Sequence, residues 1–127
     1  MNVVAVTVDG AFLVDLDDGT ALPFSGEAAG AAEPVLNLPR VVGAAAAGAT
    51  VVAVVDAKPP LMVSHDGGLT WRASGRGLPP GRAVAVCGDD PDLVVFAARN
   101  RLYVSRDGGV FWTALPLELP ELVAVSF

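Results

Sequence analysis

Ser64-His65-Asp66-Gly67-Gly68-Leu69-Thr70-Trp71 returns 41 residues later as Ser105-Arg106-Asp107-Gly108-Gly109-Val110-Phe111-Trp112. We call residues 64–71 the first box and residues 105–112 the second box. Both follow the pattern Ser-x-Asp-Gly-Gly-x-x-Trp, in which the glycines allow the positive φ angles of tight turns. A pattern repeated at this spacing indicates a chain assembled from copies of one supersecondary unit.

Apolar runs flank each box and predict four strands per repeat. Two of these runs form a hairpin before each box, and they are rich in β-branched and aromatic residues, which favour strands. They are residues 51–55 with 61–64, and residues 93–97 with 102–105. One further run precedes each hairpin, at 40–47 and at 82–87, and a short run follows each box. Four antiparallel strands per repeat are typical of the blade of a β-propeller.

Residues 44–47 are four alanines, and alanine also has the highest helix propensity. We interpret them as strand, because small side chains fit the innermost strand of a blade, which lies close to the propeller axis. Blade 2 then comprises residues 40–75 and blade 3 comprises residues 82–115. The fold class that follows is an all-β propeller of four-stranded antiparallel blades.

Blade 1 is divided between the two ends of the chain. Its N-terminal part, residues 1–24, predicts only three strands. These strands include a degenerate box, in which Asp15 takes the place of the serine and Asp17 that of the aspartate. Residues 121–127 resemble residues 82–87 and would supply the missing innermost strand.

Three blades cannot close a ring, because propellers have about 4–8 blades. An open arc would expose apolar blade faces and unpaired strand edges. Two chains give six blades, so we predict a homodimer that forms one six-bladed ring. In this ring, residues 121–127 of each chain complete blade 1 of the partner chain. Completion of the ring by a different protein is the alternative.

Both boxes resemble the Asp-box, also called the bacterial neuraminidase repeat. The residues that carry the resemblance are Ser64, Asp66, Gly68, Thr70 and Trp71 in the first box, and Ser105, Asp107, Gly109 and Trp112 in the second. Phe111 stands where the family usually has threonine. The resemblance implies a propeller similar to those of sialidases and other glycosidases, sortilin-type receptors and photosystem assembly factors. It also implies that each box is a structural turn between the third and fourth strands, away from the active centre.

Charged residues at equivalent places in the repeats form the candidate binding site. They are Arg40, Arg82 and Glu121, each directly before an innermost strand, and Lys58, Arg99 and Arg101 in the hairpin loops. This position places them near one mouth of the central channel. In a dimer they would surround the mouth and could hold a small anionic ligand, a carbohydrate or a protein segment. Solvated charges at the starts of strands are the simpler alternative.

The sequence offers no catalytic constellation of the sialidase type. Such a site needs an arginine triad, a tyrosine–glutamate pair and an acidic proton donor, whereas the single tyrosine, Tyr103, lies within an expected strand. Cys87 lies in an apolar alternation and is interpreted as a buried thiol. His65 is interpreted as an exposed box residue. We predict no metal and no cofactor, and enzymatic activity stays uncertain.

Composition restricts the partners and the location. Hydrophobic residues make up 53% of the chain and charged residues 17%, as in globular proteins. The net charge of −6 argues against nucleic acid and against an anionic membrane. The N-terminus lacks a signal-peptide pattern, and the uncharged run at 41–55 is shorter than the roughly 20 residues of a membrane-spanning helix, so we expect a cytoplasmic protein.

The leading function is that of a non-enzymatic binding or scaffold protein. A glycan-binding or glycoside-hydrolase-like protein is one alternative, favoured by the family resemblance. An assembly factor that acts on a larger complex is the other.

Overall fold

The computed structural model describes residues 1–26 and 33–127. Within these residues, twelve β-strands form three four-stranded antiparallel sheets. The first sheet contains β1 (Asn2–Thr7), β2 (Gly10–Asp15), β3 (Thr20–Phe24) and β12 (Leu122–Ser126). The second contains β4 (Val41–Ala47), β5 (Thr50–Val55), β6 (Leu61–Ser64) and β7 (Arg72–Ser74). The third contains β8 (Ala83–Val86), β9 (Val94–Ala97), β10 (Leu102–Ser105) and β11 (Thr113–Ala114).

The all-β fold and the four strands per unit are thereby confirmed. The alanine run at 44–47 is part of β4, so its interpretation as strand is confirmed as well. In the part of the chain that the structure describes, there is no helix of the length and apolarity that a membrane crossing requires.

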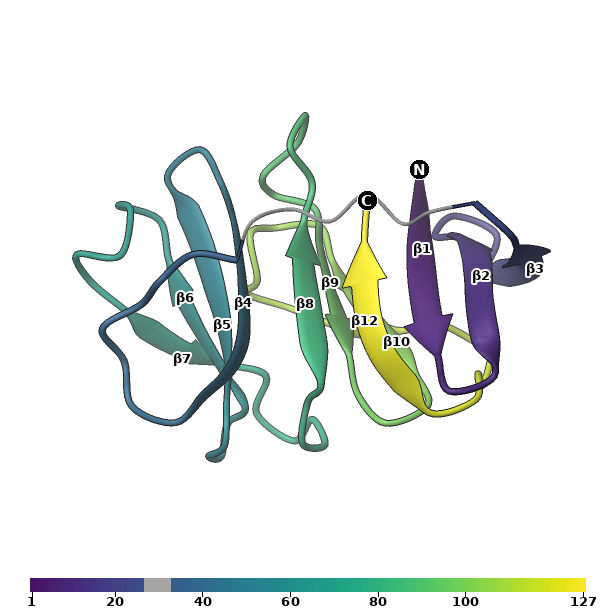
Figure 1. Cartoon of the computed structure of the whole chain (residues 1–127). Helices are drawn as coiled ribbons and strands as arrows, with labels where there is room; N and C mark the ends of the chain where they lie inside the picture. Colours follow the sequence, from purple (N-terminus) through teal and green to yellow (C-terminus); the bar gives the residue numbers. More distant parts are fainter. Residues whose placement is uncertain (27–32) are drawn as a thin grey trace.

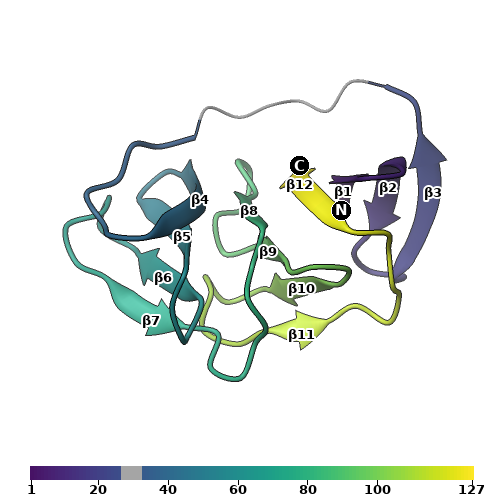
Figure 2. The same cartoon turned by 60° about the horizontal axis from the view of Figure 1, so that its bottom comes forward.

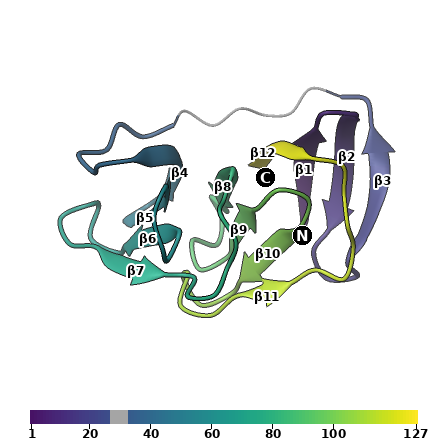
Figure 3. The same ribbon diagram turned by 90° about the horizontal axis from the view of Figure 1, so that it is seen from below.

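The three sheets stand side by side in an arc, with β4, β8 and β12 along its inner side (Figure 1, Figure 2). Strand β8 contacts β4 and also contacts β12, so the third sheet lies between the second and the first. The strands β7, β11 and β3 lie on the outer side of the arc (Figure 3). This is the arrangement of neighbouring blades in part of a β-propeller.

Two hydrophobic cores hold the arc together, because side chains on opposite faces of the third sheet pack against different neighbours. The core between the second and third sheets, which we call seam 2–3, includes Val52, Val54, Leu61, Val94 and Phe96. The core between the third and first sheets, which we call seam 3–1, includes Val95, Leu102, Val3, Val14 and Leu122. Strand β9 therefore contributes to both cores, and all four of its residues are buried.

The C-terminal strand completes the first sheet of its own chain. Strand β12 pairs antiparallel with β1, with Val125 opposite Ala5. The structure contains one chain, so the expectation that residues 121–127 join the partner chain stays a prediction. The connection between β3 and β4 has sixteen residues, compared with eight between β7 and β8 and seven between β11 and β12. A connection of this length can reach from the first sheet, at one end of the arc, to the second sheet at the other.

The first box is a hydrogen-bonded turn between β6 and β7. The Ser64 hydroxyl donates to Asp66 Oδ1 over 2.7 Å and accepts the N–H of Gly68 over 2.8 Å. Asp66 also accepts the N–H of Thr70 over 2.9 Å and its hydroxyl over 2.5 Å. Hydrogen bonds from Thr70 and Ser64 lower the pKa of Asp66 to about 2.

The second box repeats this geometry between β10 and β11. The Ser105 hydroxyl donates to Asp107 Oδ1 over 2.7 Å and accepts the N–H of Gly109 over 2.8 Å. Asp107 accepts the backbone N–H groups of Phe111 and Val110, over 3.0 and 3.1 Å. These bonds, with that from Phe111 the largest cause, lower the pKa of Asp107. The boxes thus build turns from their serine and aspartate side chains.

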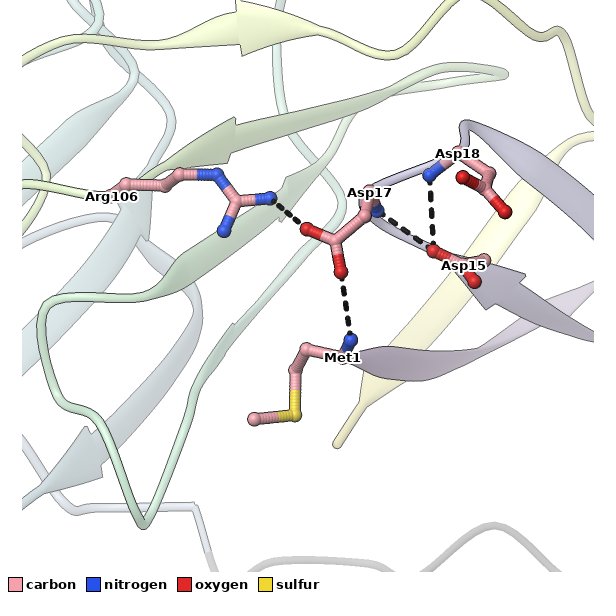
Figure 4. Close-up of polar contacts among 5 residues, drawn as sticks. All are labelled: Met1, Asp15, Asp17, Asp18 and Arg106. Atoms are coloured by element: carbon pink, nitrogen blue, oxygen red, sulfur yellow. Dashed lines mark hydrogen bonds and ion pairs between the residues drawn. The ribbon is translucent and has the colours of Figure 1, made fainter.

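The degenerate box after β2 closes differently. Asp15 Oδ1 accepts the N–H groups of Asp17 and Asp18 over 2.8 and 3.1 Å (Figure 4). The Asp17 carboxylate instead lies 3.1 Å from the α-amino group of Met1 and 3.0 Å from the Arg106 guanidinium (Figure 4). The Met1 amino group and then Arg106 lower the pKa of Asp17. Asp17 stands in the position of the box aspartate, but its carboxylate pairs with Arg106 and so connects the first sheet to the third.

Candidate ligand site among the inner strands

A cavity of about 620 Å³ lies between β4, β8 and β12 on the inner side of the arc. Its walls are made by residues 42–46, 82–86 and 123–127. Glycine, alanine and valine predominate in these stretches, and their small side chains leave the space open. Among the described residues that line the cavity, the charged side chains are Glu33 and Arg82.

Arg82 is held at the start of β8 by its backbone. Its N–H donates to the carbonyl oxygen of Ala97 over 2.8 Å, which anchors the start of the innermost strand to the end of β9. The Arg82 side chain is exposed, and it makes no ion pair with the residues that the structure describes. Its guanidinium is therefore available to a ligand.

Arg40 and Glu121 lie at the same end of their sheets as Arg82. The carbonyl oxygen of Arg40 accepts the N–H of Asp56 over 2.9 Å, and that of Glu121 accepts the N–H of Val8 over 2.9 Å. Each of these bonds joins the start of an innermost strand to the neighbouring hairpin loop. Neither Arg40 nor Glu121 is among the described residues that line the cavity.

The hairpin-loop cations also lie outside the cavity. Arg99 approaches Glu121 to 3.5 Å, and Arg101 approaches Glu118 to 3.1 Å. Lys58 lines a smaller cavity of about 260 Å³ beside the loop between β5 and β6. Of the six candidate residues, the structure thus brings one, Arg82, to the space between the inner strands.

Two residues of the cavity were not foreseeable as site residues from the sequence. Glu33 Oε1 accepts the N–H of Ala44 over 2.9 Å, yet Glu33 precedes β4 in a stretch without regular patterning. Ser126 Oγ is buried in the cavity wall and has no hydrogen-bond partner among the described residues. Buried hydroxyl groups are nearly always hydrogen-bonded, so this one is suited to bind a ligand.

The other chemically reactive side chains serve packing. Tyr103 lies in seam 2–3 with its ring 5.9 Å from that of Phe96. Cys87 is a free thiol, 3% exposed, within the core of seam 3–1. The described part of the chain contains no cluster of three or more residues that could hold a metal ion.

Glycoside hydrolysis usually requires two carboxyl groups on either side of the scissile bond. Among the described residues of the cavity, Glu33 supplies the one carboxylate side chain. The described part of one chain therefore supplies one such carboxyl group to this cavity.

Comparison with known proteins finds a similar fold in a solved glycoside hydrolase. The chain is similar to the GH74 enzyme of Niastella koreensis, a β-propeller glycoside hydrolase, with a TM-score of 0.53 and 23% sequence identity. The similarity covers 97% of this chain and 19% of that enzyme, so the chain spans about a fifth of the enzyme's length. No protein-family model matches the chain, and no curated protein matches it. At this identity the comparison shows the fold alone, that of a partial β-propeller.

Proposed function

We propose that this protein is a non-enzymatic β-propeller binding protein that acts as a homodimer and holds an anionic ligand between its inner strands. The observation that carries the proposal is the cavity of about 620 Å³, in which Arg82 is a cation without an ion pair among the described residues. The unpartnered Ser126 hydroxyl adds a polar group to the same wall. A carboxylate or phosphate, on a small molecule or an acidic protein segment, has the matching chemistry.

We also assign the two boxes to the Asp-box family. Equivalent serines and aspartates make the same hydrogen bond over 2.7 Å in both boxes. The paired glycines have positive φ angles in both, 73° and 96° in the first box and 74° and 91° in the second. These shared features support a common origin of the repeats, with a structural role for the boxes.

The outer face of the first sheet supports the dimer. Alternation along the strands directs Val3 and Val14 into seam 3–1, so Val4 and Leu13 point to the opposite face. Leu22, which pairs with Leu13, lies on that face and is 68% exposed. An apolar sheet face of this kind normally packs against another layer of structure.

A second copy of the chain can supply that layer. The first and second sheets stand at opposite ends of the arc (Figure 2), so a two-fold axis can place the first sheet of each copy against the second sheet of the other. The ring would then contain six blades, within the usual range of about 4–8. The chain segment that leads into β4 runs along the side of the second sheet that faces away from β8 and would belong to this contact (Figure 2, Figure 3).

The binding proposal is tested with an array of sialosides, uronate-containing glycans, neutral glycans and acidic peptides. We expect anionic members to bind the wild-type protein and the Arg40→Ala control with equal strength, and to bind Arg82→Ala more weakly. Arg40 is a suitable control because it is an exposed arginine at the equivalent position of another sheet but does not line the cavity. Anion binding that is equally strong in Arg82→Ala and in the wild-type protein would contradict the proposed site.

A glycan-processing protein is the second candidate, and the similarity to a glycoside hydrolase favours it. Its test is the release of reducing sugar from a glycan panel, measured for the wild-type protein and for Glu33→Gln. Turnover that disappears in Glu33→Gln would establish hydrolysis and overturn the non-enzymatic proposal.

A further inference from the structure

We infer a second binding site for a small oxyanion, a carboxylate or phosphate group, on the far side of seam 2–3 from the channel. It is a pocket of about 280 Å³ beside β7, lined on one side by the second sheet and on the other by the second box. Its basic side chains are His65, Arg72 and Arg76. This site is independent of the channel and of Arg82.

A fixed framework surrounds the pocket. The Ser74 hydroxyl donates to the carbonyl oxygen of Gly109 and accepts the indole N–H of Trp112 over 3.0 Å, so it joins the second sheet to the second box. The His65 ring packs against Gly108, where a side-chain Cβ would come within 2.8 Å of its Cε1 atom. The two sheets are thereby held at a constant separation, as a binding site requires.

The charge of the pocket is opposite to that of the whole chain. The net charge of the protein is −6, yet none of the described residues that line this pocket is acidic. Arg72 and Arg76 are exposed and make no ion pair with the described part of the chain. The Asp92 carboxylate does not line the pocket, although its Oδ1 atom would lie 3.4 Å from a Cβ at Gly108.

The equivalent pocket on seam 3–1 has a different lining and is not expected to bind an oxyanion. Val63 pairs with Arg72 in the second sheet, and Val104 pairs with Thr113 in the third, so threonine replaces the arginine there. His65 corresponds to Arg106, which is neutralised by Asp17 at 3.0 Å. The pocket at that seam also contains an acidic residue, Asp107. Only the pocket at seam 2–3 thus keeps a cationic lining among the described residues.

Two guanidinium groups beside a small pocket suit an oxyanion. Arginine presents a planar fork of donors that matches the oxygens of carboxylate and phosphate, and such charge-assisted bonds are stronger than neutral ones. A volume of about 280 Å³ is small for a ligand site, so the pocket fits a single head group or an acidic monosaccharide rather than a polymer.

The site is tested by two-dimensional NMR titration of the labelled protein with inorganic phosphate and with glucuronate, at constant ionic strength, and with glucose as the neutral control. We expect the amide signals of Ser74, Gly108 and Gly109 and the indole signal of Trp112 to shift with one or both anions and not with glucose. The comparison between phosphate and glucuronate identifies which oxyanion is preferred.

Two variants locate the binding. Arg72→Thr introduces the residue found at the equivalent position, and Arg76→Gln removes the second charge, and each should weaken the affinity on the order of tenfold. Arg82→Gln, which alters the channel, should leave the titration unchanged. Unchanged affinity in both Arg72→Thr and Arg76→Gln, or loss of the shifts in Arg82→Gln, would overturn the site. Absence of shifts in the wild-type protein would overturn it as well.

Discussion

The aspartates of the two boxes have short side chains whose carboxylates accept hydrogen bonds from backbone N–H groups of their own turns. Asp66 accepts two hydrogen bonds from Thr70 and one from Ser64. Asp107 has Phe111 in place of the threonine, so it lacks the bond from a threonine hydroxyl. This difference accounts for the strong lowering of the Asp66 pKa, to which the Thr70 hydroxyl contributes most. Ionised Asp66 therefore stabilises the folded turn.

This stabilisation predicts a pH dependence of unfolding. The folded-state pKa of Asp66, about 2, lies below its ordinary value of 3.8. The contribution is therefore complete above pH 4 and is lost as the pH falls from about 4 to about 2. The midpoint temperature of thermal unfolding should fall less over this interval for Asp66→Asn than for the wild type. The control Asp89→Asn, in another turn, should show the same fall as the wild type. Equal pH profiles for Asp66→Asn and the wild type would refute this role.

A single methyl group added at Gly81 should destabilise the fold by steric overlap. A Cβ atom at this position would overlap the buried ring of Phe96 and come within 2.8 Å of Val54 Cγ1. Gly81→Ala should thus lower the free energy of unfolding by about 1–3 kcal/mol, measured with urea. Gly88→Ala is the matched control, because nothing lies within 4 Å of a Cβ there. Equal stability of the two variants would contradict the packing of seam 2–3.

The residues of the boxes could be foreseen, whereas those of the cavity could not. A serine and an aspartate two positions apart, followed by paired glycines, determine a turn through local hydrogen bonds, and the sequence displays all of them. The contacts of Glu33 with β4 and of Asp17 with Arg106 join segments that are distant along the chain. No local pattern indicates such pairs, which is why the sequence pointed to Arg82 but not to Glu33 as a charged residue of the cavity.

At the scale of elements, the strands followed from β-branched alternation and from the position of the turns. The sequence did not indicate which chain's first sheet β12 joins. The repeat pattern shows that a strand completes this sheet but not which chain supplies it. That depends on the length and path of the connection between β3 and β4. In the structure of one chain, β12 pairs with its own β1.

A designed disulfide tests this pairing. Val4 lies opposite Ser126 across β1 and β12, at a separation suited to a cross-strand disulfide. In a Cys87→Ala background, Val4→Cys with Ser126→Cys should form the bond within one chain and migrate at 12.9 kDa on a non-reducing gel. A covalent dimer on that gel would show instead that β12 is exchanged between chains.

For the whole molecule, we propose that two half-propellers close into one ring. The arc of three sheets has two ends, and the exposed apolar face of the first sheet is the part that most requires a partner. Leu22→Lys places a charge on that face and should separate the dimer. Phe111→Lys is the control, since Phe111 and Leu22 are similarly exposed, at 76% and 68%. Phe111 belongs to the second box and not to the outer face of the first sheet.

Light scattering coupled to gel filtration measures the mass of the assembly in solution. The wild-type protein and Phe111→Lys should have a mass of about 26 kDa, twice the 12.9 kDa of one chain, and Leu22→Lys should have the mass of one chain. A wild-type protein that is folded and has a mass of 12.9 kDa at micromolar concentration would contradict the six-bladed ring.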